Sequence, residues 1–422
     1  MDAAPLQNEA SLSCDAHVTA RNPWSGILRV GNIDCATLTL ALAEVPISIA
    51  VAESLLALAL AARLIRCFRG EARVALPRIF WLWLAFAAAE IVAWLFSPSL
   101  KDGWGEIRHL LLIGSLFFVV PALETGTSRI NAWRAIFLST AVGSLFLIGD
   151  FVSRLVYYRR EIAAGADVSF YLRTGGLLNN WMVYGTVEIL VVAGLVSFWF
   201  VYPEQRRRWW PVVALNAVAI VVSLTRTVWV STLLLLAIQL WWKRSRWLWA
   251  LPLLPVAVYI LAQGAVRSRL SVSIRPDYFS NAERIQMLQV GSRMVREHPW
   301  LGVGPGRVES LYRSYLNPSD PVPAYHGHLH NNLAQMAAQF GVPVTLVAML
   351  FTVFLFRDLV RATRRADNKE KEFLARAALL ALIGFAAAGL FDYTFGHSLA
   401  LILATFAVTS PLIPTTHRSQ IR

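Results

Sequence analysis

The residues whose types and spacing suit chemistry lie in one polar stretch, from Gly264 to Gln339, in a sequence that otherwise consists of apolar runs. Three histidines occur near its end, at His326, His328 and His330. A neutral imidazole, with an unperturbed pKa of about 6.5, can accept a proton from a hydroxyl at neutral pH. Because His330 lies at the predicted start of an apolar helix, we expect it to be a rigidly held general base.

The same histidines could instead bind a metal ion. Zinc sites usually add cysteine or carboxylate ligands from a second cluster, and the nearest acid in the sequence is Asp320. We therefore expect a site without metal or cofactor. A carboxylate base remains the alternative, and its candidates are Glu283, Asp320, Asp392 and Glu188.

Apolar segments long enough to cross a bilayer position these residues. The chain has 422 residues, 56% hydrophobic and 15% charged, whereas soluble domains carry about a quarter charged residues. A bilayer core of roughly 30 Å requires about 20 apolar residues per helix. The first segment is long enough for two helices that separate at Glu44-Val45-Pro46, so we predict an all-α polytopic membrane protein with eleven or, as we prefer, twelve spans. The segments are 34–65, 75–96, 107–123, 131–153, 178–202, 209–223, 227–242, 247–263, 329–356, 373–391 and 396–413.

Basic loops set the predicted orientation, because arginine and lysine concentrate in cytoplasmic loops. The strongly basic clusters are 63–78, 206–208, 243–246 and 357–376. Placing them in the cytoplasm divides the chain into N-terminal transmembrane helices (1–263), one large outer loop (264–328) and C-terminal transmembrane helices (329–422).

Two local elements are predicted within the large loop. Residues 281–297 should form an amphipathic helix whose Ile285 and Leu288 face inward. Three glycines then form a tight turn, at Gly302, Gly304 and Gly306. No strand precedes this turn and no Gly-Lys-Ser/Thr follows it, so a nucleotide site is not indicated. We expect a structural turn that allows close backbone approach.

Arginine dominates the basic residues: of 39 lysines and arginines only four are lysine, and the net charge is +13. A guanidinium binds phosphate through two hydrogen bonds. Arginines at the outer face break the usual charge bias and are functional candidates, although each alone could extend to lipid headgroups. We predict that they bind a lipid-linked phosphate or pyrophosphate. We expect no nucleic-acid partner, because no basic stretch lies on a soluble domain. The candidates are Arg226, Arg173, Arg284, Arg267, Arg269 and Arg154.

Four segments together resemble the O-antigen ligase and polymerase superfamily. Residues 329–335 (Leu-His-Asn-Asn-Leu-Ala-Gln) with 341–343 (Gly-Val-Pro) resemble its His-Asn-x-x-Leu-x-Gln … Gly pattern. Residues 298–306 resemble its Pro-and-glycine turn, and Arg226 lies where members carry a Ser-Arg or Thr-Arg pair opening a span. Residues 173–176 (Arg-Thr-Gly-Gly) resemble its Arg-x-x-Gly segment. The four segments follow the family's order over about 170 residues.

The resemblance implies a GT-C-type glycosyltransferase in the bacterial inner membrane, with about twelve transmembrane helices, one large periplasmic loop and an active site facing the periplasm. Ligases of this family transfer a glycan from undecaprenyl pyrophosphate to the lipid A–core oligosaccharide in lipopolysaccharide biosynthesis, without metal or nucleotide. His330 would then be the catalytic base of an inverting transfer, and the arginines would hold the pyrophosphate. His328, His326 and Asn331 would orient the base or the acceptor.

Other functions remain open. An O-antigen polymerase or a protein O-oligosaccharyltransferase would share these segments and differ in the acceptor, but polymerases tend to carry two large arginine-rich loops, and only one loop is large here. A transporter or flippase of anionic lipids would also suit many helices and outer arginines. The sequence has no internal repeat and no obvious pair of broken helices, which favours the enzyme.

Overall fold

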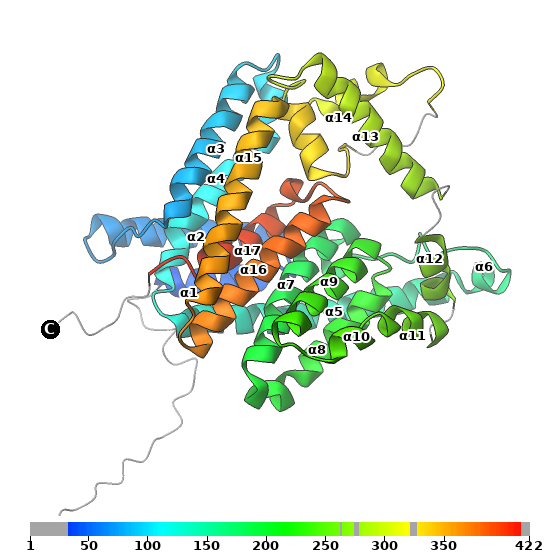
Figure 1. The fold of residues 1–422 in the computed structure, drawn as a ribbon, viewed down its shortest axis with the longest axis horizontal. Coiled ribbons are helices and arrows are strands. Elements are labelled where there is room, and N and C mark those ends of the chain that lie inside the picture. Colours follow the sequence, from blue (N-terminus) through cyan, green and yellow to red (C-terminus); the bar gives the residue numbers. More distant parts are fainter. Residues whose placement is uncertain (1–32, 262–263, 274–277, 321–326, 415–422) are drawn as a thin grey trace, which may run out of the picture.

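The computed structural model describes residues 33–261, 264–273, 278–320 and 327–414, and all regular structure in these ranges is helical (Figure 1). The α-helices are α1 (Ile33–Glu44), α2 (Ile49–Phe68), α3 (Arg78–Leu95), α4 (Leu100–Val119), α5 (Gly126–Tyr157), α6 (Arg159–Ala163), α7 (Trp181–Val201), α8 (Arg206–Val222), α9 (Arg226–Trp242), α10 (Trp247–Ala250), α11 (Leu253–Leu261), α12 (Ala265–Ser273), α13 (Phe279–Glu297), α14 (Val308–Leu311), α15 (Asn332–Arg364), α16 (Lys369–Gly389) and α17 (Ser398–Thr409).

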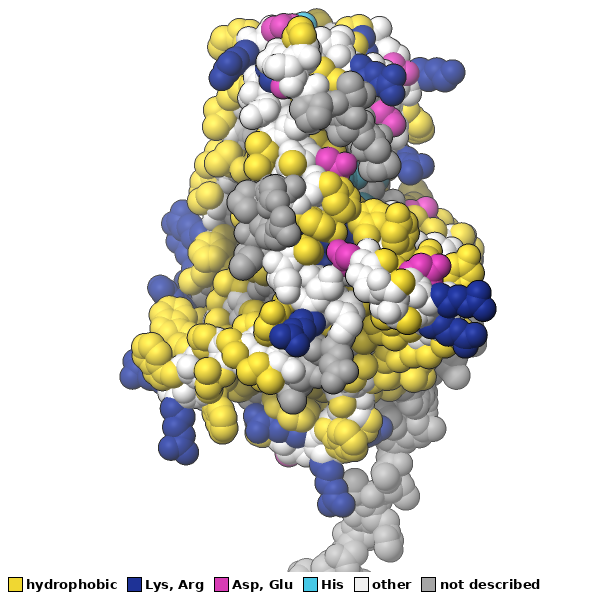
Figure 2. All heavy atoms as spheres, turned by 90° about the vertical axis from the view of Figure 1, so that its right-hand side faces the viewer, with side chains coloured by type: hydrophobic (Ala, Val, Ile, Leu, Met, Phe, Trp, Pro, Cys, Tyr) yellow, Lys and Arg dark blue, Asp and Glu magenta, His cyan; other side chains and the backbone are white. Residues whose placement is uncertain are grey.

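The helices are those of a polytopic membrane protein. Within the described residues six are long and apolar enough to cross a bilayer, namely α3, α4 with its short 3-10 extension, α5, α7, α15 and α16; α9, α10–α11 and α17 are shorter apolar helices. Figure 2 shows hydrophobic side chains over much of the lower half of one face, as expected of a surface in lipid. The chain also separates as predicted around Pro46, between the end of α1 and the start of α2. The count of twelve spans and the GT-C architecture stay predictions.

Helices α7 and α16 form the centre of the bundle and pack along each other. Helix α7 is buried around most of its circumference, which explains why its apolar residues show no one-sided periodicity. Gly194 of α7 permits close approach of the Trp133 indole, because a Cβ there would lie 2.5 Å from the ring. The centre therefore fixes α7, α9 and α16, which surround the site described below.

The basic loops meet at one end of the bundle. Helices α15 and α16 run in opposite directions and pack together, so Asn332 and Gly389 lie at the end remote from Lys369. At the basic end, Lys369 forms an ion pair with Glu204 at 3.1 Å, and Lys243 approaches Glu372 at 3.7 Å. The loops before α8, after α9 and before α16 therefore share one end, opposite the start of α15.

The described residues of the segment 264–328 are largely helical and have their own small core. Helix α13 packs against α15, and Met287, Val290 and Met294 of α13 are buried in a cluster that includes Val303 and Leu329. Helix α13 therefore turns the side that carries Met287, Val290 and Met294 towards the first turns of α15.

The prediction that Ile285 and Leu288 of α13 face inward was wrong. Ile285 is 53% exposed and Leu288 is 44% exposed, because the side of α13 that carries them does not pack against α15. Both side chains line a cavity instead.

The glycine turn docks onto a break in α15. Gly341 has φ +83° within α15, and this break exposes backbone groups that the turn uses. The Val303 amide donates to the Ala338 carbonyl at 2.8 Å, the Gly304 amide donates to Gln339 at 3.1 Å, and the Val342 amide donates to Pro299 at 2.8 Å. Gly302, Gly304 and Gly306 all have positive φ, which side chains with a Cβ rarely adopt.

Candidate active site

The sequence suggested that His330 begins the apolar helix. In the structure it lies just before α15, two residues ahead of Asn332. Asn331 is the N-cap of the helix, and its side chain accepts the Ala334 amide at 2.9 Å. His330 itself has φ +49°, a left-handed conformation that is uncommon for non-glycine residues and is frequent at functional sites. It is 8% exposed, so a turn held by the helix start positions the imidazole.

Two asparagines attach the start of α15 to the loop that follows α16. The Asn331 side chain donates to the Leu390 carbonyl at 3.0 Å. The Asn332 side chain donates to the Thr394 hydroxyl at 2.7 Å and accepts the Thr394 amide at 2.8 Å. These bonds place residues 59 and 62 positions apart side by side, and they fix the loop that carries Asp392.

Asp392 lies between two histidines. Its Oδ1 is 3.1 Å from His330 Nδ1, and its Oδ2 is 3.1 Å from His397 Nε2. Burial raises the pKa of the Asp392 carboxyl, but the hydrogen bonds from His330 and His397 and the charges of His397 and His328 outweigh it and hold this pKa well below its usual range. An ionised carboxylate at Nδ1 favours the tautomer whose Nε2 carries the free lone pair. His330 can therefore act as a base through Nε2.

His328 lies against His330, with ring centroids 4.2 Å apart. Ligand atoms of His328, His330 and Asp392 all lie within 4.8 Å of one another, so this group could hold a divalent ion. Both Asp392 oxygens and His330 Nδ1 already take part in the histidine–carboxylate contacts, and a metal would have to replace some of them. His326 lies outside the described residues.

Four of the six predicted arginines line one cavity with His330 and Asp392: Arg173, Arg226, Arg269 and Arg284. We call it the arginine cavity; it has a volume of about 700 Å³. Its arginine-bearing part is formed by residues before α7, at the start of α9 and on α12 and α13. Its remaining walls are mainly apolar side chains of α7, α9 and α16, with Ile285 and Leu288 of α13. Arg173 and Arg269 are buried, whereas Val230, Ile285 and Leu288 are exposed, so the cavity joins a buried cationic part to an apolar part at the surface.

Aromatic rings hold Arg173 in place. Its guanidinium carbon lies 4.1 Å from the ring centre of Phe170 and 4.6 Å from that of Trp181. Burial, together with the charges of Arg269, Arg284 and Arg226, lowers the pKa of Arg173 to about 9. Repulsion among these cations favours entry of an anion.

The other arginines connect the helices around the cavity. Arg226, the first residue of α9, donates to the Ser280 hydroxyl of α13 at 2.8 Å. Arg269 is 2% exposed and donates to the Leu224 carbonyl at 3.3 Å. Burial is the largest cause that lowers the pKa of Arg284, and it outweighs the opposing charge of Asp392. Arg284 Nε is buried and has no hydrogen-bond partner among the described residues.

Arg154 and Arg267 lie elsewhere, so the structure does not bring them to the cavity. Arg154 pairs with Asp150 at 3.1 Å and donates to the Tyr171 carbonyl. The Arg267 guanidinium lies 5.0 Å from the ring centre of Tyr259. Arg154 thus contacts its own helix and the loop before α7, and Arg267 contacts the preceding helix α11.

Residues 211–349 match the family model described as O-antigen ligase. The match covers about a third of the chain and supports the resemblance to the O-antigen ligase superfamily. The matched range holds Arg226, Arg269, Arg284 and His330, while Arg173 and Asp392 lie outside it. No curated protein matches the chain.

Of the carboxylates that the sequence offered as alternative bases, Asp392 alone is among the residues that line the arginine cavity. Asp320 is bound to Arg293 at 2.5 Å. Glu188 and Glu283 are not among the residues that line the arginine cavity. Asp392 does line it, but as the partner of His330 rather than as its replacement.

Sequence reasoning missed the pairing of Asp392 with His330 and the contribution of His397. The available signal was weak: an acid and a histidine in a short loop between two apolar helices at the predicted outer end. Only the docking of this loop onto α15 shows which histidine the acid contacts.

Proposed function

We propose that the protein transfers a glycan from undecaprenyl pyrophosphate to the lipid A–core oligosaccharide at the periplasmic face of the bacterial inner membrane, without a metal or cofactor. The observation that carries the proposal is the His330–Asp392 pair in a cavity that four arginines also line. The match of residues 211–349 to the O-antigen ligase family model supports glycan transfer as the reaction class.

His330 is the general base of the proposed reaction. Its Nε2 accepts the proton of an acceptor sugar hydroxyl while Asp392 accepts a hydrogen bond from Nδ1–H and stabilises the imidazolium that forms. The acceptor oxygen then forms a bond to the anomeric carbon of the donor glycan. His328, beside the ring of His330, and Asn331, which fixes the turn, orient the base.

The arginines act on the leaving group. As the new bond forms, the bond between the anomeric carbon and the pyrophosphate oxygen breaks, and its electron pair passes to the pyrophosphate. Attack from the opposite side inverts the anomeric centre. Arg173, Arg226, Arg269 and Arg284 stabilise the charge that develops on the departing oxygen, as preorganised cations do in phosphoryl chemistry.

The apolar part of the cavity suits the isoprenoid chain of the donor. Val230 and Leu234 of α9 and Ile285 and Leu288 of α13 line it and are exposed. Exposed apolar side chains beside a cationic site match a ligand with a charged head and a hydrocarbon tail. This also explains why the side of α13 that carries Ile285 does not enter the protein core.

The location of the site supports a periplasmic orientation. The start of α15 and the end of α16 lie opposite the basic loops, which prefer the cytoplasm. In this proposal the segment 264–328 is the periplasmic loop between the transmembrane helices of 1–263 and 329–422.

Glycan transfer with purified components tests the proposal. Wild-type and His330→Ala proteins would be incubated with lipid-linked glycan and lipid A–core, with and without EDTA. We expect transfer by the wild type in EDTA, and none by a folded His330→Ala protein that still binds the donor. Loss of wild-type activity in EDTA, restored by a divalent ion, would instead assign a metal to His328, His330 and Asp392.

The same assay separates the related reactions. Growth of the donor glycan on a second lipid-linked glycan would identify a polymerase, and transfer to a polypeptide would identify a protein O-oligosaccharyltransferase. Movement of the intact donor across a vesicle membrane without glycan transfer would identify a flippase.

A further inference from the structure

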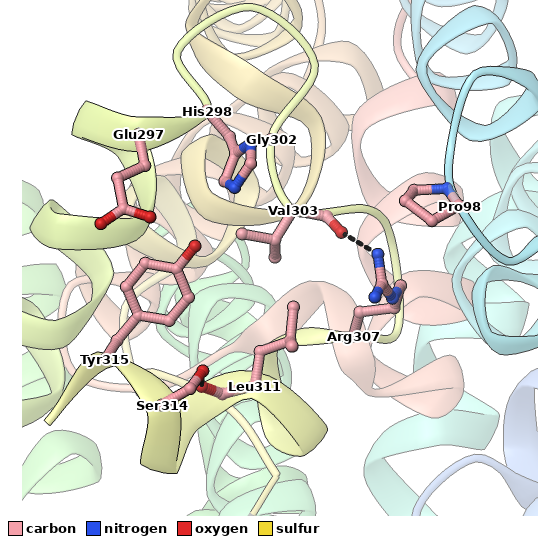
Figure 3. A pocket seen from close by; sticks show the side chains of 9 residues that line it. All are labelled: Pro98, Glu297, His298, Gly302, Val303, Arg307, Leu311, Ser314 and Tyr315. Carbon is pink, nitrogen blue, oxygen red and sulfur yellow. Dashed lines mark hydrogen bonds between the residues drawn. The ribbon is translucent and has the colours of Figure 1, made fainter.

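A second cavity, of about 400 Å³, lies beyond the end of α13 (Figure 3). It is formed by the end of α13, the glycine turn, α14 with the 3-10 helix Tyr312–Tyr315, and Pro98 between α3 and α4. We call it the loop cavity. No described residue lines both this cavity and the arginine cavity.

The lining of the loop cavity combines hydrogen-bonding groups with a small apolar surface. Figure 3 shows Glu297 and Tyr315 on one side and Arg307 on the other, with the apolar Val303 and Leu311 between them. The partial burial of Tyr315 and the adjoining carboxylate of Glu297 raise the pKa of the phenol. Tyr315 is therefore a neutral hydroxyl at physiological pH.

The charge of the loop cavity differs from that of the arginine cavity. One carboxylate, Glu297, and one guanidinium, Arg307, face the same space, so the two charges offset each other. Arg307 is also held in place, because it donates to the Val303 carbonyl at 3.0 Å. A phosphate would be repelled by Glu297, whereas a neutral polyhydroxylated ring can donate to the carboxylate and accept from the guanidinium.

The loop cavity is rigidly connected to His330. The amide of Val303 is bonded to Ala338 of α15, and Val303 shares a buried core with Leu329, the neighbour of His330. On the opposite wall, Arg293 of α13 donates to the Tyr315 carbonyl at 2.8 Å. A ligand in the loop cavity would therefore be held in a fixed relation to the base.

We propose that the loop cavity is a carbohydrate-binding subsite that holds one neutral sugar residue of a glycan substrate through Glu297, Arg307 and Tyr315. This inference rests on the proposed glycan transfer. The sugar ring places its hydroxyls between the carboxylate and the guanidinium and its C–H face on Val303 and Leu311. The ring belongs either to the acceptor oligosaccharide or to the donor glycan, both of which have this chemistry.

Binding without turnover tests the subsite. Saturation-transfer NMR would be recorded on the full-length protein in detergent with two probes: core oligosaccharide and donor glycan, each released from its lipid by mild acid. We expect one probe to bind the wild type, and Glu297→Gln to weaken that binding about tenfold, the loss expected of one charged hydrogen bond. Tyr315→Phe should weaken it severalfold. The KM of the matching lipid-linked substrate should rise by similar factors with kcat little changed.

Glu309→Gln is the matched control, because Glu309 is an exposed carboxylate on α14 that does not line the cavity. A loss confined to the core oligosaccharide would identify the acceptor, and a loss confined to the donor glycan would identify the donor. The subsite is overturned if neither probe binds, or if Glu297→Gln and Tyr315→Phe bind both probes as Glu309→Gln does. The NMR experiment measures binding and needs no reaction. It can therefore support or overturn the subsite even if the protein does not catalyse glycan transfer.

Discussion

At the scale of single residues, the backbone of His330 carries the clearest mark of function. A non-glycine residue in the left-handed region costs about 1–3 kcal/mol and persists only where its surroundings enforce it. The neighbours do so here: the Leu329 amide donates to the Gln335 side chain at 2.8 Å, and Asn331 caps the helix. The strain aims the imidazole at Asp392 and the cavity.

Asp392→Asn should remove the carboxylate that sets the His330 tautomer. We expect kcat for glycan transfer to fall by roughly 10³- to 10⁴-fold, as loss of the orienting carboxylate does in histidine-assisted acyl transfer, while donor affinity changes little. Steady-state transfer kinetics and a donor-binding assay would measure both. A variant that retains more than about a tenth of wild-type kcat would contradict the role of Asp392.

Arginines inside and outside the arginine cavity should differ in their effect on donor binding. Arg226→Lys and Arg284→Lys keep the positive charge but cannot form the bidentate hydrogen bonds of a guanidinium with phosphate. The affinity for the donor should therefore fall about tenfold or more. Arg154→Lys and Arg267→Lys are the controls, since these residues lie outside the cavity, and both should bind the donor like the wild type. Equal losses in all four variants would show that general surface charge, not the cavity, binds the donor.

At the scale of elements, the glycine turn and the broken helix α15 form one unit. The turn supplies hydrogen-bond partners for backbone groups freed by the break at Gly341, and buried backbone groups need such partners. The unit links both cavities, because α15 begins beside His330 and the turn forms a wall of the loop cavity.

Gly302→Ala should disrupt this unit. The residue has φ +64°, and a Cβ would lie 2.5 Å from the Ala338 and Gln339 carbonyl oxygens. We expect the unfolding free energy to fall by about 2 kcal/mol or more, seen as a lower thermal unfolding temperature in detergent. Gly105→Ala is the control, because a Cβ at this helical position on α4 meets nothing within 4 Å and alanine favours helix. A Gly302→Ala protein as stable as the wild type would refute the close packing.

At the scale of the whole molecule, the two ends of the bundle differ in chemistry. Basic loops joined by Lys369–Glu204 and Lys243–Glu372 occupy one end, and the two cavities with the helical segment 264–328 lie towards the other. The charge bias of membrane insertion would produce this division if, as proposed, the site faces the periplasm.

Cysteine labelling would test this orientation. In a protein with Cys14, Cys35 and Cys67 replaced by serine, Ser310→Cys should react with a membrane-impermeant maleimide in cells with a permeabilised outer membrane. Arg207→Cys should react only after the inner membrane is opened. The reverse pattern would place the site in the cytoplasm and remove the proposed lipid-linked donor from its reach.

Part of the site could be predicted from the sequence because its residues lie in local patterns. His330 and its asparagines form one short motif, and Arg173, Arg226 and Arg284 each adjoin the start of a helix or lie within one. The sequence could not show which of two nearby residues reaches the cavity. Arg267 and Arg269 were both predicted to bind phosphate, but only Arg269 lines the cavity. The inward face of α13 was mistaken because two of its sides carry apolar residues, and only the position of α15 selects between them.

The sequence by itself determined the membrane class, the helical architecture and the break near Pro46, because length, hydropathy and proline act within a few residues of chain. The tertiary structure alone decided the partner of His330, the four arginines that share a cavity and the side of α13 that faces it. These depend on contacts between residues far apart, such as Asn332 with Thr394, and no local pattern encodes which surfaces meet when helices pack. The chemistry of the candidate site is therefore a property of how the loop after α16 docks onto the start of α15.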